Sequence, residues 1–178
     1  MSKVHMELAE RIRGEIPDLD RVVQRVLLAW ELASESSEQR DIYLDSVALN
    51  LHGFYSGLER IFELIARHVD CDLPRGENWH SVLLWQVARD KEEVRPAVIS
   101  EKSASLLDEL RRFRHLVRNV YAVNLVPRKI EPLVYPLPEL WQLLQAELMA
   151  FAEFLEDLAR ASEGKVYDED WNVDGQGS

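Results

Sequence analysis

The apolar residues between Gln39 and His68 constrain the fold more strongly than any other feature of the sequence. They recur in alternating steps of three and four residues, the spacing that places side chains on one face of an α-helix. The members of this series are Leu44, Val47, Leu51, Phe54, Leu58, Ile61 and Ile65. A long helix with one apolar face is typical of a helical bundle, in which that face is buried.

Two glycines, Gly53 and Gly57, interrupt this predicted helix. Each glycine costs about 1 kcal/mol relative to alanine in a helix interior when nothing compensates. The close approach of a second helix, which the missing side chain permits, is one compensation.

The same spacing, together with prolines and capping residues, predicts the remaining helices. One of them begins at Pro17, with Asp18 and Asp20 in its first turn, an arrangement that favours a helix N-terminus. The expected helices cover residues 4–13, 17–33, 39–68, 79–90, 96–123 and 139–160. Four prolines exclude a continuous helix over residues 126–138. We therefore predict an all-α, up-and-down bundle of four to five helices, with a short extra helix over residues 4–13.

The length of 178 residues fits a single domain. We place that helical domain at residues 1–163. Residues 164–178 are dense in acidic side chains and have no helical period, so we predict an acidic, mobile tail there.

Composition excludes several classes of protein. The single cysteine, Cys71, rules out a disulfide framework and a cysteine-based zinc site. The histidines His52, His68 and His80 lack the compact spacing of metal ligands, so we predict neither a metal nor a cofactor. No apolar run is long enough to span a bilayer, and the N-terminal residues do not resemble a signal peptide. These features predict a cytoplasmic protein that does not contact a membrane.

The net charge is −11, from 32 Asp and Glu against 21 Lys and Arg, which argues against a generally basic surface for nucleic acid. The charge is unevenly distributed, because residues 105–130 carry six basic and only two acidic side chains. At about 100° per residue, several of these basic side chains share one arc of the predicted helix. The residues on this arc are Arg111, Arg114, His115 and Arg118.

Two interpretations of this arc remain open. Guanidinium groups offer forked donors and stay charged, so the arc suits a phosphate group. Alternatively, the arginines pair with acidic residues on neighbouring helices, such as Glu59 and Glu63.

The segment FRHLVRNVY, residues 113–121, resembles the signature helix of the HEPN superfamily, specifically the HepT-like toxins encoded beside minimal nucleotidyltransferases. Their pattern is an Arg, a polar residue, three variable residues and then His-x-Tyr. Arg114, His115 and Tyr121 occupy the first, second and last of these places, whereas Asn119 stands where the family has its histidine. Two further stretches, SVALNLHGFYSGLERIFELIA and ENWHSVLLWQVA, are similar to a HepT-like subgroup, so the resemblance covers about residues 39–133.

The resemblance implies a toxin that cleaves RNA without a metal, with Arg steadying charge on the phosphate and His transferring a proton to or from the 2′-hydroxyl. Asn119 forms hydrogen bonds but does not titrate, so it cannot serve as a general acid or base. His115 lies one turn before Asn119 and is either a substitute or a group that only binds phosphate or carboxylate. The implied catalytic residues are Arg114, Asn119 and His115, with Arg111 and Arg118 as phosphate-binding residues.

The resemblance also implies partners. HEPN proteins usually dimerise with their motif helices facing each other, so we expect a homodimer with RNA as its substrate. In HepT-like toxins a nucleotidyltransferase antitoxin is thought to attach AMP to the motif tyrosine, which here is Tyr121; the alternative is a tyrosine that only packs its ring. A second hypothesis, favoured by Asn119, is a non-catalytic binding subunit that docks a nucleotidyltransferase or a nucleotide.

Overall fold

The computed structural model describes residues 2–119 and 125–170 of the chain, with the side chains of residues 2–114 and 125–162. Within these ranges the chain forms helices and no strand, and one isolated β-bridge joins Lys91 and Arg95. The helices are α1 (Ser2–Glu35), α2 (Arg40–His68), α3 (Trp79–Val87), α4 (Glu101–Asn119), α5 (Pro127–Val134) and α6 (Leu137–Asp170). This confirms the predicted all-α fold class.

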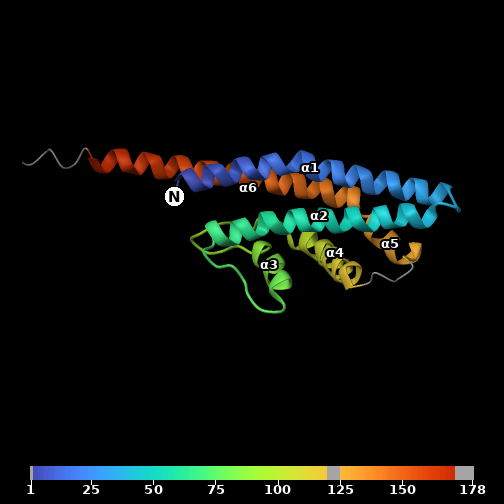
Figure 1. The fold of residues 1–178 in the computed structure, drawn as a ribbon. Helices are drawn as coiled ribbons and strands as arrows, with labels where there is room; N and C mark the ends of the chain where they lie inside the picture. Colours follow the sequence, from blue (N-terminus) through green and yellow to red (C-terminus); the bar gives the residue numbers. More distant parts are fainter. Residues whose placement is uncertain (1, 120–124, 171–178) are drawn as a thin grey trace, which may run out of the picture.

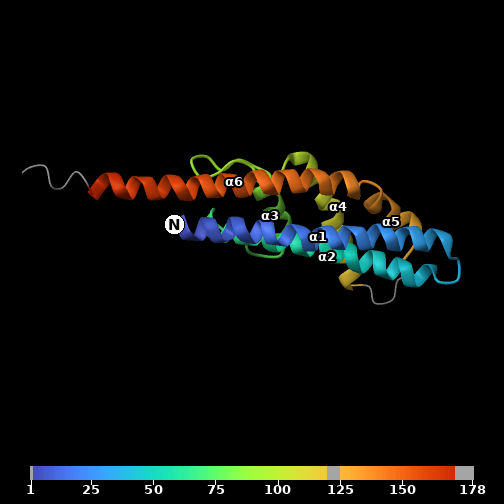
Figure 2. The same cartoon turned by 90° about the horizontal axis from the view of Figure 1, so that it is seen from above.

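The long helices α1, α2 and α6 lie side by side and give the molecule an elongated shape (Figure 1). Helix α1 runs antiparallel to both α2 and α6 and packs against each of them (Figure 2). The shorter α3 and α4 lie on the other side of α2 and pack against it (Figure 1), whereas α5 contacts α1 and α6. Helix α2 is therefore the central element that joins α1 to α3 and α4.

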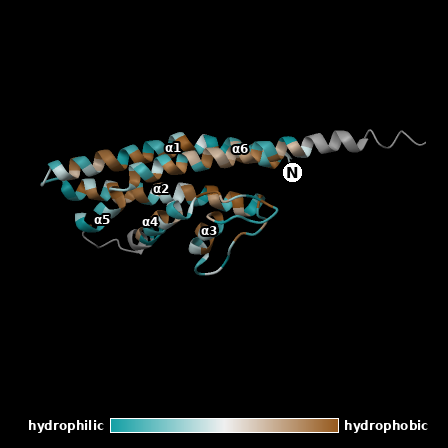
Figure 3. Ribbon diagram, turned by 180° about the vertical axis from the view of Figure 1, so that it is seen from behind, coloured by the Kyte–Doolittle hydropathy of each residue, from teal (hydrophilic) through white to brown (hydrophobic). Residues whose placement is uncertain are grey.

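The core follows the apolar face of α2, as the sequence predicts. All seven members of the apolar series on this helix are buried, and each such burial stabilises the fold by about 1.5–3 kcal/mol. Phe54 on α2 also meets Trp141 on α6 edge to face, with ring centroids 5.6 Å apart. Figure 3 shows hydrophobic positions alternating with hydrophilic ones along the long helices, the pattern of elements buried on one side.

Only one of the two glycines in α2 has the predicted close neighbour. A Cβ atom on Gly57 would lie 2.7 Å from Cδ2 of Leu19 on α1, so a side chain there would require the Leu19 side chain to shift. A Cβ atom on Gly53 would meet nothing within 4 Å. Of the two glycines, Gly57 is therefore the one whose missing side chain the packing of α2 against α1 requires.

The prediction of two separate N-terminal helices is wrong. Helix α1 is continuous from Ser2 to Glu35 with Pro17 inside it. An interior proline removes one backbone hydrogen bond and costs about 3 kcal/mol. The apolar side chains on both sides of Pro17, including Leu8, Ile12, Leu19 and Val23, are buried in the same core, and their burial outweighs that local cost.

Helix α4 begins at Glu101 rather than near Pro96. Ser100 immediately precedes it, and its Oγ accepts a hydrogen bond from the Ser103 N–H at 3.2 Å, the interaction that fixes a helix N-terminus. The α4 start is therefore determined by a serine cap and not by the proline.

The proline-rich stretch contains a short helix. Helix α5 starts with Pro127 at its first position and ends before Pro136, so the exclusion of a continuous helix over residues 126–138 is confirmed. Helix α6 then runs to Asp170, and the expected end near residue 160 is wrong. An interior glycine such as Gly164 costs only about 1 kcal/mol, which is too little to end a helix.

The segment 164–178 thus begins as a helical continuation of α6, and residues 171–178 lie outside the described part. The division of the chain into a domain over residues 1–163 and a mobile tail stays a prediction. None of the described helices is long and apolar enough to cross a membrane.

Candidate functional site

Arg114 on α4 is joined to Glu59 on α2. Its Nη1 donates to both carboxylate oxygens of Glu59, at 2.7 Å to Oε1 and 3.0 Å to Oε2. The Glu59 side chain is only 5% exposed and that of Arg114 is 16% exposed. Glu59 lies beside Leu58 on the buried side of α2, where a carboxylate requires a charged or hydrogen-bonding partner. The sequence therefore places an acid in the core and an arginine opposite it.

His80, near the start of α3, contacts the same carboxylate. Its Nδ1 lies 2.7 Å from Oε2 of Glu59. Because an ionised carboxylate only accepts hydrogen bonds, Nδ1 carries the proton, and Nε2 of the neutral ring carries the lone pair. Nη1 of Arg114 lies 3.4 Å from Nδ1 of His80, because both nitrogens are donors to the same Glu59 carboxylate. We call these three residues the Glu59–Arg114–His80 cluster.

Aromatic rings enclose this cluster. The Trp79 ring packs against the His80 imidazole with centroids 3.6 Å apart and planes tilted by 32°. The Arg114 guanidinium lies 5.9 Å from the centroid of the Tyr55 ring, a favourable cation–π distance. Burial, followed by the charge of Glu59, raises the pKa of Tyr55 well above its usual value, so this tyrosine stays neutral. The rings restrict the rotation of both the imidazole and the guanidinium.

Arg111, the other arginine of the predicted arc whose side chain is described, is also ion-paired. Arg111 Nε lies 2.7 Å from Oδ1 of Asp108 on the same helix. Arg112, which neighbours the arc, lies 2.7 Å from the other oxygen of Asp108. Pairing with a neighbouring helix, one of the two interpretations of the sequence, is thus found for Arg114 with Glu59. For Arg111 the partner is an acid of α4 itself.

Several predicted site residues lie outside what the structure describes. His115, Arg118 and Asn119 belong to the α4 backbone, but their side chains are outside the described part, and so is the whole of Tyr121. The roles assigned to these residues stay predictions, as do the phosphate-binding role of Arg111 and the catalytic role of Arg114.

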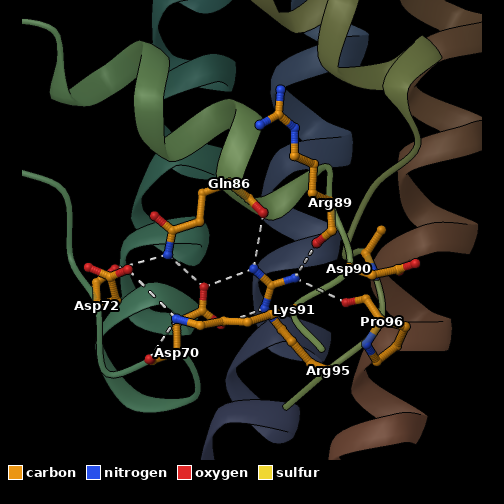
Figure 4. A network of polar contacts seen from close by, with 9 residues as sticks. Asp70, Asp72, Gln86, Arg89, Asp90, Lys91, Arg95 and Pro96 are labelled. Carbon is orange, nitrogen blue, oxygen red and sulfur yellow. Dashed lines mark hydrogen bonds and ion pairs between the residues drawn. The ribbon is translucent and has the colours of Figure 1, made fainter. Parts of the chain in front are cut away.

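A buried ion pair holds the far end of α3. Nε and Nη2 of Arg95 donate to the two carboxylate oxygens of Asp70 at 2.6 and 2.8 Å, and both side chains are 0% exposed. Arg95 also donates to the backbone carbonyls of Gln86, Arg89 and Pro96. Figure 4 shows Arg95 at the centre of this network. We call it the Asp70–Arg95 clasp.

The clasp matters for the site because it determines where α3 lies. Asp70 follows the end of α2, and the Gln86 carbonyl belongs to the last turn of α3. The Gln86 side chain adds a hydrogen bond of 2.6 Å to the Asp70 carboxylate. Helix α3 is therefore fixed to α2 at its C-terminal end, while its N-terminal end presents His80 to Glu59.

Sequence reasoning considered His80 as a metal ligand. It also noted that Arg75 and His80 formally match the motif spacing, but discounted this match because Pro74 and Gly76 place Arg75 in a loop. It did not find the contact of His80 with Glu59. Both residues lie in the stretches that resemble the HepT-like subgroup, and this was the available signal. Among the residues that the structure describes, no group of three or more His, Cys, Asp or Glu side chains is arranged to hold a metal ion.

The protein is thus an all-α bundle in which Arg114 of α4 contacts Glu59 of the central helix α2. A family model described as "HepT-like protein" matches residues 46–155, more than half of the chain and a range that includes the whole cluster. The chain belongs to the HepT-like family, and its fold is that of a HEPN-like bundle. Comparisons with curated proteins and with solved structures gave no significant match.

Proposed function

We propose that the chain is the toxin of a HepT-like toxin–antitoxin pair and that it acts on RNA without a metal ion. The observation that carries this proposal is the Glu59–Arg114–His80 cluster, in which the motif arginine lies 3.4 Å from an imidazole. A cation for the phosphate and a group able to exchange a proton are the two components that such a reaction needs. Family membership supports the proposal, because HepT-like proteins are generally paired with a nucleotidyltransferase antitoxin.

In this proposal Arg114 contacts the phosphate, and Arg111 and Arg118 bind neighbouring phosphates. Asn119 and His115, which belong to the same helix, complete the proposed RNA-binding site. The protein acts as a homodimer whose motif helices face each other. Tyr121 accepts AMP from the antitoxin, and this modification silences the toxin.

The test is expression of the chain in a bacterial host, with growth and the integrity of total RNA as readouts. Wild type is expected to arrest growth and fragment RNA, and Arg114→Ala is expected to do neither. Arg114→Lys, which keeps a charge beside Glu59 but loses the forked donor, should also be inactive while remaining folded. Arg112→Ala is the matched control, since Arg112 is an exposed arginine of the same helix. A wild-type chain that neither arrests growth nor cleaves RNA contradicts the proposal.

A second function, a non-catalytic subunit that docks a nucleotidyltransferase or a nucleotide, is favoured by one specific observation. The Glu59 carboxylate accepts two hydrogen bonds from Arg114 and compensates the charge of this motif arginine, and Asn119 cannot titrate. This function predicts that a nucleotidyltransferase gene lies beside this one, that its product forms a stable complex with the chain, and that wild type does not cleave RNA. Attachment of AMP to the chain, lost in Tyr121→Phe, would support the paired antitoxin under either function.

A further inference from the structure

We propose that His80, oriented by Glu59, is the general acid–base group that takes the place of the missing motif histidine. This inference rests on the proposed ribonuclease function and names a catalytic residue for it. It comes from contacts between α2, α3 and α4 that the order of residues along the chain does not reveal.

The hydrogen bond to Glu59 determines which nitrogen of the His80 imidazole carries the proton. The 2.7 Å contact with Glu59 fixes the proton on Nδ1, so the lone pair of the neutral ring is on Nε2. A carboxylate that holds one nitrogen of a histidine in this way orients the ring and stabilises the imidazolium that forms when the other nitrogen accepts a proton. Glu59 therefore prepares His80 to act as a base through Nε2.

The His80 imidazole is accessible from the surface and lies beside the motif arginine. The His80 side chain is 26% exposed, while Glu59 behind it is 5% exposed, so the imidazole lies between the buried carboxylate and the surface. Trp79 covers one side of the ring. The guanidinium of Arg114 is within 3.4 Å, and in RNA the 2′-hydroxyl lies next to the phosphate that such a guanidinium would bind. One nucleotide can thus reach both groups.

The motif itself supplies, in its described residues, no group that exchanges a proton. Asn119 occupies the place of the family histidine and cannot exchange a proton. Among the described side chains of α4, every motif or arc residue is an arginine that stays protonated. His80 is the imidazole that the described residues bring to the motif arginine.

Nε2 of neutral His80 accepts the proton of the 2′-hydroxyl, and the 2′-oxygen forms a bond to the adjacent phosphorus. The bond between phosphorus and O5′ breaks, and its electron pair passes to O5′. The proton held by His80 then returns, directly or through water, to O5′. The products are a 2′,3′-cyclic phosphate and a 5′-hydroxyl end, and His80 is restored to its neutral form.

The alternative is that His80 only supports Glu59. The variant His80→Asn separates the two roles, because the asparagine amide places a donor where Nδ1 was and keeps the Glu59 hydrogen bond while removing the titrating nitrogen. His68→Asn is the matched control, since His68 is an exposed histidine at the end of α2.

The assay measures cleavage of total host RNA by the purified full-length variants, with thermal unfolding as a check of the fold. We expect His80→Asn to reduce the rate by about 100-fold or more with an unchanged melting temperature, whereas His68→Asn retains activity. Added imidazole should restore part of the cleavage by His80→Ala but none by Arg114→Ala, a rescue that a purely structural role would not give.

Two results overturn the inference in distinguishable ways. If wild type and His80→Asn cleave RNA at comparable rates while Arg114→Ala is inactive, the ribonuclease function stands and the role of His80 is wrong. If wild type itself cleaves no RNA, the proposed function fails and the role of His80 fails with it.

Discussion

At the scale of single residues, Glu59 is the side chain on which the arrangement of the site depends. It projects from the central helix into a region lined by apolar side chains, and it accepts hydrogen bonds from both Arg114 and His80. Removing one partner of a buried ion pair is far more destabilising than replacing the whole pair, because the remaining charge loses its compensation. Glu59 therefore links the stability of the fold to the geometry of the site.

We expect Glu59→Ala to lower the free energy of unfolding by about 3 kcal/mol, the lower part of the range for buried pairs, because Arg114 stays partly exposed. Glu63→Ala is the matched control on the same helix and should change stability by less than about 0.5 kcal/mol. Urea denaturation of both variants measures the difference. Equal stabilities for the two variants would contradict the importance of the Glu59 pair.

At the scale of elements, the two glycines of α2 make opposite predictions. Gly57→Ala should destabilise the protein by about 1–3 kcal/mol, because its Cβ would overlap the Leu19 side chain on α1. Gly53→Ala should stabilise it by up to about 1 kcal/mol, because that position is open and alanine favours a helix. Thermal unfolding of the pair checks both signs at once, and a stabilising Gly57→Ala would show that the Leu19 side chain can move aside without cost.

The Asp70–Arg95 clasp is the element that fixes α3, and its loss should be severe. Arg95→Met leaves the fully buried Asp70 carboxylate without its charged partner, so we expect a loss of about 3–5 kcal/mol. Arg89→Met, which changes an exposed arginine of the same segment, should be nearly neutral. The double variant Asp70→Leu with Arg95→Met should recover part of the loss, since it removes both charges. Chemical denaturation is the measurement, and a neutral single Arg95→Met variant would refute this role.

These elements also show how far the sequence predicts the structure. The course of α2 follows from the spacing of its apolar residues, because the residues that recur at the helical period are the ones that the fold buries. The continuity of α1 through Pro17 does not follow, since a local cost competes with burial against helices distant in sequence. Glu59 is recognisable as a partner of Arg114, whereas His80 and the Asp70–Arg95 pair depend on the path of the loops around α3, which no short-range pattern encodes.

At the scale of the whole molecule, the predicted homodimer remains to be measured. Light scattering of the purified chain should give twice the mass of one 20.7 kDa chain if the motif helices of two copies face each other. A monomer at micromolar concentration would contradict the predicted dimer, and any shared cleft would then be absent.

The internal pairing of Arg114 has a consequence for selectivity. An anion that approaches this guanidinium meets a competitor that is already part of the protein, because Glu59 holds the same Nη1 with two hydrogen bonds. Small anions with one contact offer too little to displace it. A polymer that brings several phosphates at once can offset the displacement through its other contacts. By competing for Arg114, Glu59 would thus prevent the abundant small anions of the cell from binding there and allow only a multivalent ligand to bind.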